Sequence, residues 1–346
     1  MKRDFIGYLA VHSGVAKVLR SIWHDQLTVL AYHRIGGTAS TFDALFDDSL
    51  YSCTQQALEQ QLLMLKRVRT IVTLNDVCDA LDGKLKLPPR AALVTFDDAT
   101  QDHYTRAFPV LRRHQINGLF FVSTRSLTER TVEWWNLLTI AIKRAAAGTY
   151  DLGELGGIVT LHDAASRVAV ARSVSDKIKS QSVRGDALPL VQDIAARLAI
   201  ALPAIEQQSD GVITPVQLIE MQSAGMTIGS HSHSHAFLNR LRPQEQLQEL
   251  QQSKAILENL LQVPVRSIAY PYGQATDYDQ HSRDAAKLAG YDCAFNLLKR
   301  RLVDPSKVDR YDIDRFPVPA QAGLSVRGVH LRHHGVIALP ELEATD

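Results

Sequence analysis

Short apolar runs recur along the chain, and each is followed by polar residues. We expect these runs to be buried strands at residues 27–32, 91–96, 118–122, 226–229, 265–269 and 292–295. Apolar residues spaced three or four apart predict helices between them, at residues 54–69, 102–114, 214–224, 243–261 and 279–288. Alternating strands and helices are typical of parallel βα units. The pattern therefore predicts an α/β fold with a parallel sheet.

Residues 131–210 interrupt this alternation and are mostly helical in pattern. Helices are expected over 134–147, 163–182 and 187–201, and we interpret the region as a helical insertion between two barrel strands. It serves either as a spacer or in substrate recognition. Trp134 and Trp135, at its start, either pack the inserted helix on the barrel or form an aromatic platform on which a ring of the substrate stacks; packing is the favoured interpretation.

The pattern divides the chain into segments: an N-terminal helix at 1–26, a first barrel part at 27–130, the insertion at 131–210, a second barrel part at 211–319, and a tail at 320–346. Residues 1–26 have an amphipathic spacing, and His12, Lys17 and Arg20 interrupt any apolar core of a secretory signal. We therefore expect a cytoplasmic protein whose first helix is able to contact a membrane or a partner.

Composition excludes some classes of function. The 346 residues include 38 basic and 37 acidic side chains, with a net charge of +1, so the chain has no overall basic field for nucleic acid. The three cysteines are scattered and form no CxxC pair. This argues against a disulfide framework or a cysteine zinc site.

Two clusters that follow predicted strands carry candidate chemistry. Asp97 and Asp98 follow the strand at 91–96, and adjacent carboxylates at a strand end are costly unless a cation or proton serves them. His231 and His235 follow the strand at 226–229, and one helical turn would aim both at one ion. Two histidines with one carboxylate form a common catalytic metal set. The alternatives are a solvated turn for the aspartates and a His-rich surface loop.

Three stretches, in order, resemble the polysaccharide deacetylases, the family-four carbohydrate esterases. They read TFDDATQDHYTRAFPVLRRHQINGLFFVST, GMTIGSHSHSHAFL and RSIAYPYGQ. The resemblance covers most of residues 27–125 and 214–318. It implies a distorted (β/α) barrel and a divalent metal, usually zinc.

The resemblance also implies roles for single residues. Asp97 matches the family's catalytic base, and Asp98, His231 and His235 match its metal ligands. Tyr272 matches the residue whose backbone N–H helps to hold the oxyanion.

The proton donor for the leaving amine departs from the usual pattern. Most members carry it in a Leu-x-x-His motif near the C-terminus, which Leu331–His334 fits. A second match, Leu30–His33, ends an apolar strand and resembles exopolysaccharide deacetylases in which this motif is permuted to the N-terminus. We favour His33 because catalytic groups in such barrels lie at strand ends. The alternatives are His334 as the acid, and His33 as a packed residue at the barrel rim.

Two further positions differ from the family. Ala269 stands where many members have an arginine that orients the catalytic aspartate, and Arg315 is the expected replacement, with Asp314 as a weaker candidate to hold the histidine or the arginine. Ala99 replaces a common glycine after the aspartate pair and removes no catalytic group.

These residues predict a metal-dependent deacetylase that hydrolyses N-acetyl groups on an amino sugar of a polysaccharide or its precursor. A catalytically inactive carbohydrate-binding barrel and a deformylase or amidase on another small amide remain alternatives. The expected partner is an N-acetylated glycan or sugar precursor. The sequence specifies neither the oligomeric state nor the sugar.

Overall fold

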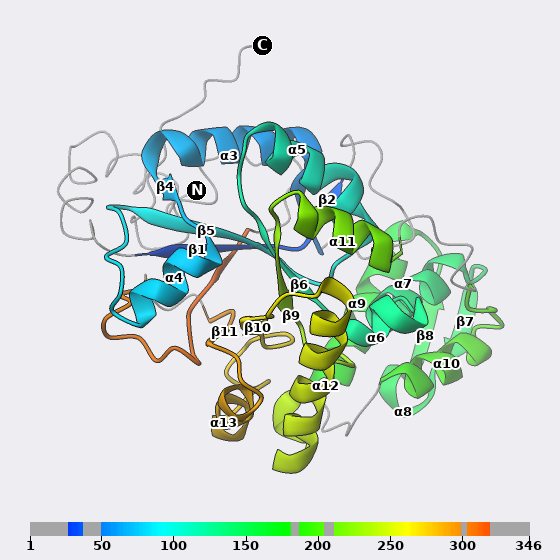
Figure 1. The fold of residues 1–346 in the computed structure, drawn as a ribbon. Helices are drawn as coiled ribbons and strands as arrows, with labels where there is room; N and C mark the ends of the chain where they lie inside the picture. Colours follow the sequence, from blue (N-terminus) through cyan, green and yellow to red (C-terminus); the bar gives the residue numbers. More distant parts are fainter. Residues whose placement is uncertain (1–26, 37–49, 181–186, 204–210, 299–302, 319–346) are drawn as a thin grey trace, which may run out of the picture.

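The computed structural model describes residues 27–36, 50–180, 187–203, 211–298 and 303–318 (Figure 1). The helix expected at residues 1–26 and the tail at 320–346, which includes His334, lie outside the described residues.

A curled sheet of parallel strands forms the centre of the molecule. Its hydrogen-bonded order is β11-β10-β9-β6-β5-β1-β12, and β4 pairs with the start of β5. The strands are β1 (Thr28–Tyr32), β4 (Thr70–Ile71), β5 (Ala91–Phe96), β6 (Leu119–Val122), β9 (Thr227–Ser230), β10 (Ser267–Ala269), β11 (Cys293–Phe295) and β12 (Phe316–Pro317). The distorted (β/α) barrel expected from the sequence is confirmed.

Helices cover the outside of this sheet (Figure 1). They are α3 (Gln55–Val68), α4 (Leu74–Leu81), α5 (Phe108–Arg113), α6 (Thr124–Glu129), α11 (Pro215–Ser223), α12 (Pro243–Leu261) and α13 (Gln280–Leu288). Side chains cap several N-termini; Thr73 and Thr214, for example, form capping boxes that begin α4 and α11. Within the described part of the chain, no helix is long and apolar enough to cross a bilayer.

Apolar residues alternate between the two faces of the sheet, so both faces are buried. Leu30, Val94 and Phe120 belong to the cluster that also contains residues of the covering helices. Val29 and Leu93 belong to a second cluster, on the opposite face of the same strands. Asp97 comes just after β5, and by the same alternation it lies on the same face of the sheet as Leu93.

Two departures from the expected elements occur near the site. Residues 102–114 begin as a π-helix, η2 (His103–Ala107), before α5. A short parallel pair, β2 (Arg34–Gly36) with β3 (Tyr51–Thr54), was not predicted. Two short strands that pair mainly with each other give little periodic signal in the sequence.

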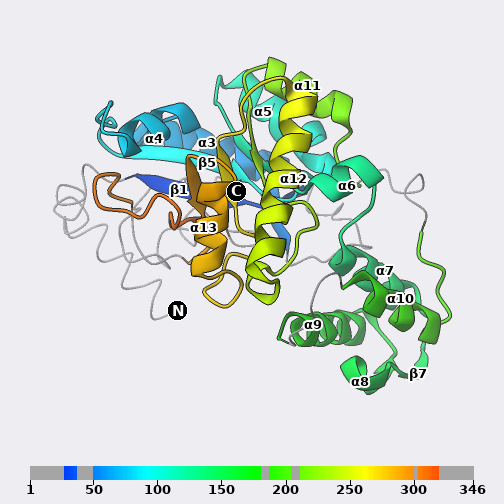
Figure 2. The same cartoon turned by 60° about the horizontal axis from the view of Figure 1, so that its bottom comes forward.

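The region between β6 and β9 forms a unit with its own apolar core at one side of the molecule (Figures 1 and 2). It contains α7 (Trp134–Arg144), β7 (Gly148–Asp151), α8 (Gly153–Gly156), β8 (Ile158–Leu161), α9 (Ala164–Ser180) and α10 (Leu188–Arg197). The three expected helices are present. The antiparallel hairpin β7–β8 was missed because it is largely exposed and Ile158 is 78% exposed, so its strands lack a buried apolar face.

Candidate active site

The candidate residues lie at the carboxyl ends of neighbouring parallel strands. The register pairs Tyr32 with Phe96, so His33 and Asp97 leave β1 and β5 at the same level. Val122 of β6 pairs with Ser230 of β9, which places His231 at the same end. Parallel strands thus bring residues distant in sequence to one rim of the barrel, where such folds place their active sites.

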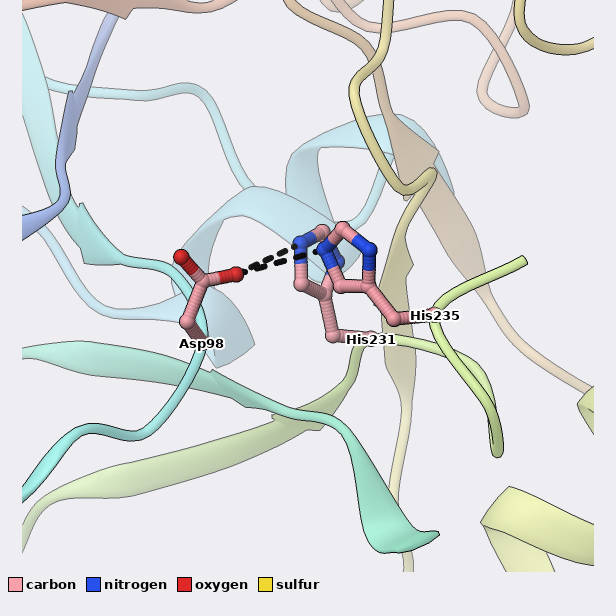
Figure 3. A group of neighbouring side chains, drawn as sticks. All are labelled: Asp98, His231 and His235. Carbon is pink, nitrogen blue, oxygen red and sulfur yellow. Dashed lines mark ion pairs between the residues drawn. The ribbon is translucent and has the colours of Figure 1, made fainter. Parts of the chain in front are cut away.

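Asp98, His231 and His235 converge there (Figure 3). Asp98 Oδ1 lies 3.5 Å from His231 Nε2 and 3.3 Å from His235 Nε2, and all three residues are buried. The helical turn expected to aim both histidines is wrong, because residues 231–235 form a bend. Ser232 and His235 have positive φ angles of 62° and 54°, and this reversal of the backbone turns both rings toward Asp98.

The polar partners of these residues fit a divalent cation. His231 Nδ1 lies 2.8 Å from the Ala269 carbonyl, so Nδ1 carries a proton and Nε2 is the ring nitrogen that faces Asp98 and would be free to bind a cation. His235 Nδ1 is buried and has no hydrogen-bond partner within the described residues. The rings of Trp135 and Tyr272 instead flank His235, with centroids 4.7 Å and 4.8 Å away. Two imidazole nitrogens and one carboxylate oxygen suit zinc.

The charge state of Asp98 agrees with this fit. Burial favours its protonated form, but hydrogen bonds from His231 and His235 outweigh burial and hold the pKa of Asp98 well below its ordinary value. The carboxylate is therefore ionised and able to bind a cation.

His233 lies in the same motif and has different partners. Its Nδ1 is 2.9 Å from Thr124 Oγ1 and its Nε2 is 3.0 Å from Gln252 Nε2. Its ring is thus engaged by α6 and α12, apart from the cluster around Asp98.

Asp97 forms a buried bidentate pair with Arg315. Arg315 Nη1 and Nη2 donate to Asp97 Oδ1 and Oδ2 at 2.6 Å and 2.8 Å, and Arg315 Nε donates to the Asn296 carbonyl at 3.0 Å. Burial favours protonated Asp97, but the charges of Arg315, His231 and His33 outweigh it, so the pKa of Asp97 is lowered. Arg315, the predicted replacement for the orienting arginine, thus lies against Asp97, whereas Asp314 accepts a hydrogen bond from Asn296.

His33 lies beside this pair. Its Nε2 is 3.8 Å from Asp97 Oδ2. Its backbone is fixed on both sides: the N–H donates to Ser52 Oγ at 2.9 Å, and the carbonyl oxygen is 2.7 Å from His103 Nε2. Burial lowers the pKa of His33, and the nearby charges of Asp97 and Asp98 offset this only in part.

Tyr272 follows β10 in a left-handed conformation, with φ of 59°. Its hydroxyl accepts a hydrogen bond from Trp134 Nε1 at 2.9 Å, and its ring stacks on Phe237. Both tryptophans are buried in the core of the insertion, which agrees with the packing interpretation. Sequence reasoning missed their contacts with Tyr272 and His235, because no periodicity relates α7 to the loops of the barrel.

Known proteins share this arrangement of elements. The solved Streptococcus pyogenes deacetylase PplD, in complex with acetate, has a TM-score of 0.54 at 16% identity, over 90% of this chain and 98% of that one. IcaB from Ammonifex degensii has a TM-score of 0.54 at 20% identity, over 85% and 91% of the two chains. The deacetylase domain of BpsB from Bordetella bronchiseptica has a TM-score of 0.52 at 18% identity, over 85% and 96%. At these identities the likeness shows the fold.

Sequence similarity identifies the family. A stretch of 106 residues is 30% identical to the Bacillus subtilis protein YxkH, whose name assigns it to the polysaccharide deacetylases. That stretch is 31% of this chain and spans 37% of the relative. A model of the polysaccharide deacetylase family matches residues 84–166 and 173–294, more than half of the chain. With its motifs at the rim of the barrel, the chain belongs to the polysaccharide deacetylase family.

Proposed function

We propose that this protein is a divalent-metal-dependent deacetylase that hydrolyses N-acetyl groups on an amino sugar of a polysaccharide or its precursor. The proposal rests on the different partners of two adjacent carboxylates. Asp98 faces two histidines at 3.3 Å and 3.5 Å, whereas Asp97 is paired with Arg315 and has His33 at 3.8 Å. One carboxylate is thus suited to bind a cation and the other to move a proton.

Asp98, His231 and His235 would hold the metal, and zinc suits this donor set. A divalent cation supplies Lewis-acid polarisation of the acetyl carbonyl and lowers the pKa of water.

The chain's own groups perform the proton transfers. Asp97 is ionised because of its lowered pKa and accepts the proton of the attacking water. The Tyr272 N–H donates to the oxyanion, since within the described residues it donates to no other acceptor. Arg315 keeps the Asp97 carboxylate in one orientation.

His33 delivers a proton to the leaving amine. Its lowered pKa makes the neutral imidazole the main form at neutral pH, so His33 must gain a proton before it donates one. Asp97 holds the proton taken from water, and its Oδ2 is 3.8 Å from His33 Nε2. Catalytic distances in a free enzyme are often longer than in the substrate complex. His33 is therefore placed to pass this proton to the nitrogen.

The first prediction tests the metal and the reaction together. The parent protein should bind one divalent ion per chain and release acetate from N-acetylated sugar donors or oligomers. The double variant His231→Ala/His235→Ala should lose both properties, since it keeps only one of the three ligands. Metal content by mass spectrometry and acetate release by an enzyme-coupled assay measure them.

His233→Ala is the matched control, because it removes an imidazole from the same motif that contacts Thr124 and Gln252. It should keep the metal. Full metal occupancy in the double variant would refute the ligand assignment. Bound metal without acetate release from any sugar would favour an inactive binding barrel, and release of formate or another acid would favour the amidase alternative. Cell fractionation tests the separate expectation of a cytoplasmic or membrane-associated enzyme.

A further inference from the structure

The N–H and the carbonyl of Tyr272 form no hydrogen bond with another described residue. Its φ of 59° is left-handed, a conformation that costs an L-residue about 1–2 kcal/mol. The flanking amides are paired: Tyr270 N–H donates to Phe295 O, and Gly273 N–H donates to Pro271 O. The bond from Gly273 N–H to Pro271 O closes a tight turn around Tyr272, and contacts of the Tyr272 side chain add to what holds its unpaired peptide groups in place.

Two contacts of that side chain lead to the insertion. Trp134 Nε1, on α7, donates to the Tyr272 hydroxyl at 2.9 Å. On one face of the ring, Phe237 stacks with a centroid distance of 3.8 Å and an interplanar angle of 5°. The Arg240 guanidinium lies 3.7 Å above Phe237 and donates to the Lys179 carbonyl in the last turn of α9.

The same region touches a metal-ligand candidate. Tyr272 packs against the apolar cluster of the insertion, and its ring lies 4.8 Å from the ring of His235. The ring of Trp135, the neighbour of Trp134 on α7, also lies beside His235, with a centroid distance of 4.7 Å. Helix α7 thus contacts both the loop after β10 and the histidine motif after β9.

We infer that Trp134 and the Phe237–Arg240 stack are positioning residues that aim the Tyr272 N–H at the reacting oxygen, so that the insertion is a working part of the active site and not a spacer. This inference rests on the proposed role of the Tyr272 N–H. An oxyanion donor acts only when it is preorganised, and a misplacement of about 1 Å can reduce a rate by about 10²-fold. Release of the side chain leaves only the turn closed by Gly273 N–H to hold the Tyr272 peptide, so we expect the alignment of its N–H to weaken.

The test compares Trp134→Phe, Tyr272→Phe and the double variant with the parent, using the full-length protein. Trp134→Phe keeps an aromatic ring and removes the donor, whereas Tyr272→Phe removes the acceptor and keeps the stack on Phe237. Tyr150→Phe is the control, because it removes a hydroxyl within the insertion that donates to Ala146. Hydrogen–deuterium exchange of the metal-free protein is followed at the amides of Gly273 and Leu297, which are bonded to the carbonyls of Pro271 and Gly273.

We expect both single variants to exchange faster at these two amides, with the control at the parental rate. With zinc bound, kcat should fall about tenfold in each single variant, and KM should stay within about twofold, as for an interaction made in the transition state. The double variant should be no worse than the singles, since both remove one contact. Zinc affinity should be unchanged.

The two readouts separate this inference from the proposed function. Parental exchange in both single variants would overturn the positioning role, even in an active deacetylase. Faster exchange together with an unchanged kcat would overturn the link between the insertion and catalysis. A parent that releases acetate from no sugar would contradict the proposed function. Faster exchange in both variants would still show that these contacts hold Tyr272 in place.

Discussion

A sharp backbone turn places the neighbouring residues Asp97 and Asp98 in different environments. Asp98 and Ala99 both have positive φ angles, 77° and 48°. Left-handed residues of this kind cost about 1–2 kcal/mol each and persist where the surrounding structure holds them. The turn lets Asp97 continue toward Arg315 while Asp98 faces the two histidines. Ala99, where the family commonly has glycine, is fully buried in the core, and this packing offsets part of the cost.

Asp97→Asn is predicted to keep the metal and lose most of the activity. Asparagine has a similar shape, but it cannot accept a proton at neutral pH, so the contribution of the base, on the order of 10²–10⁴-fold in rate, should disappear. The three metal-ligand candidates are untouched. Metal content and kcat/KM are measured on the same preparation. Parental activity would show that Asp97 is not the base, and loss of the metal would show that it contributes to binding the ion.

At the scale of elements, a buried ion pair connects β2 to the π-helix η2. Asp102, just before η2, accepts from Arg34 Nε at 3.1 Å and from the backbone N–H of Ile35. Both charged side chains are almost fully buried. The next residue, His103, contacts the carbonyl of His33. These contacts hold the backbone at the His33 carbonyl and at Ile35, next to the proposed acid. Single π-helical turns are frequent at functional sites.

Asp102→Asn is predicted to destabilise the protein by about 3–5 kcal/mol, because it leaves the Arg34 charge buried without its counterion. The loss should be measured by urea unfolding near pH 7. Burial favours protonated Asp102, but the charge of Arg34 outweighs it and lowers the pKa. The stabilisation is therefore present above the ordinary carboxyl pKa of about 3.9 and is lost as the pH falls through the lower folded-state pKa. The parent and variant should converge in acid.

Asp193→Asn provides the matched control for that measurement. It breaks the exposed pair of Asp193 with Arg197 on α10, which solvent screens and which should therefore contribute little to stability. Equal stability losses in the two variants would contradict the special role of the buried pair.

The sequence predicted elements whose burial gives a period and missed those whose contacts are not local. Helix α12 occupies residues 243–261 as expected, because its apolar positions repeat along one face. The hairpin β7–β8 lacks such a face. The positions of Asp97, Asp98 and the two histidines at one rim followed from strand ends. The link between Trp134 and Tyr272 joins residues 138 apart and could not be seen without coordinates.

At the scale of the whole molecule, the barrel and the insertion meet at the candidate site. The barrel supplies the polar residues after β1, β5, β9 and β10, and the insertion supplies aromatic rings from α7. A barrel rim alone would leave Tyr272 and His235 open to solvent on the side that α7 covers. The surroundings of Tyr272 and His235 are therefore set by both units.

Two positions in the chain are candidates for the proton donor: His33 after β1, and His334 in the C-terminal motif. In the permuted arrangement, β1 carries the histidine and lies between β5 and β12. His33 then follows β1 directly, 3.8 Å from Asp97, and its backbone is held by Ser52 and His103. The alternative donor, His334, lies outside the described residues.

His33→Ala is predicted to reduce kcat by about 10²–10⁴-fold with the metal retained, because it removes the proton donor and none of the ligand candidates. His334→Ala should keep parental activity. The pH profile adds a second measure: in this relay neutral His33 receives its proton from Asp97, so the rate that depends on His33 should fall as the pH drops through its lowered pKa, and this part of the acidic limb should be absent in His33→Ala. A substrate with a more acidic leaving amine should raise the rate of His33→Ala more than that of the parent, since such an amine needs less protonation to leave. Loss of activity in His334→Ala together with a fully active His33→Ala would refute the permuted arrangement and assign the acid to the C-terminal motif.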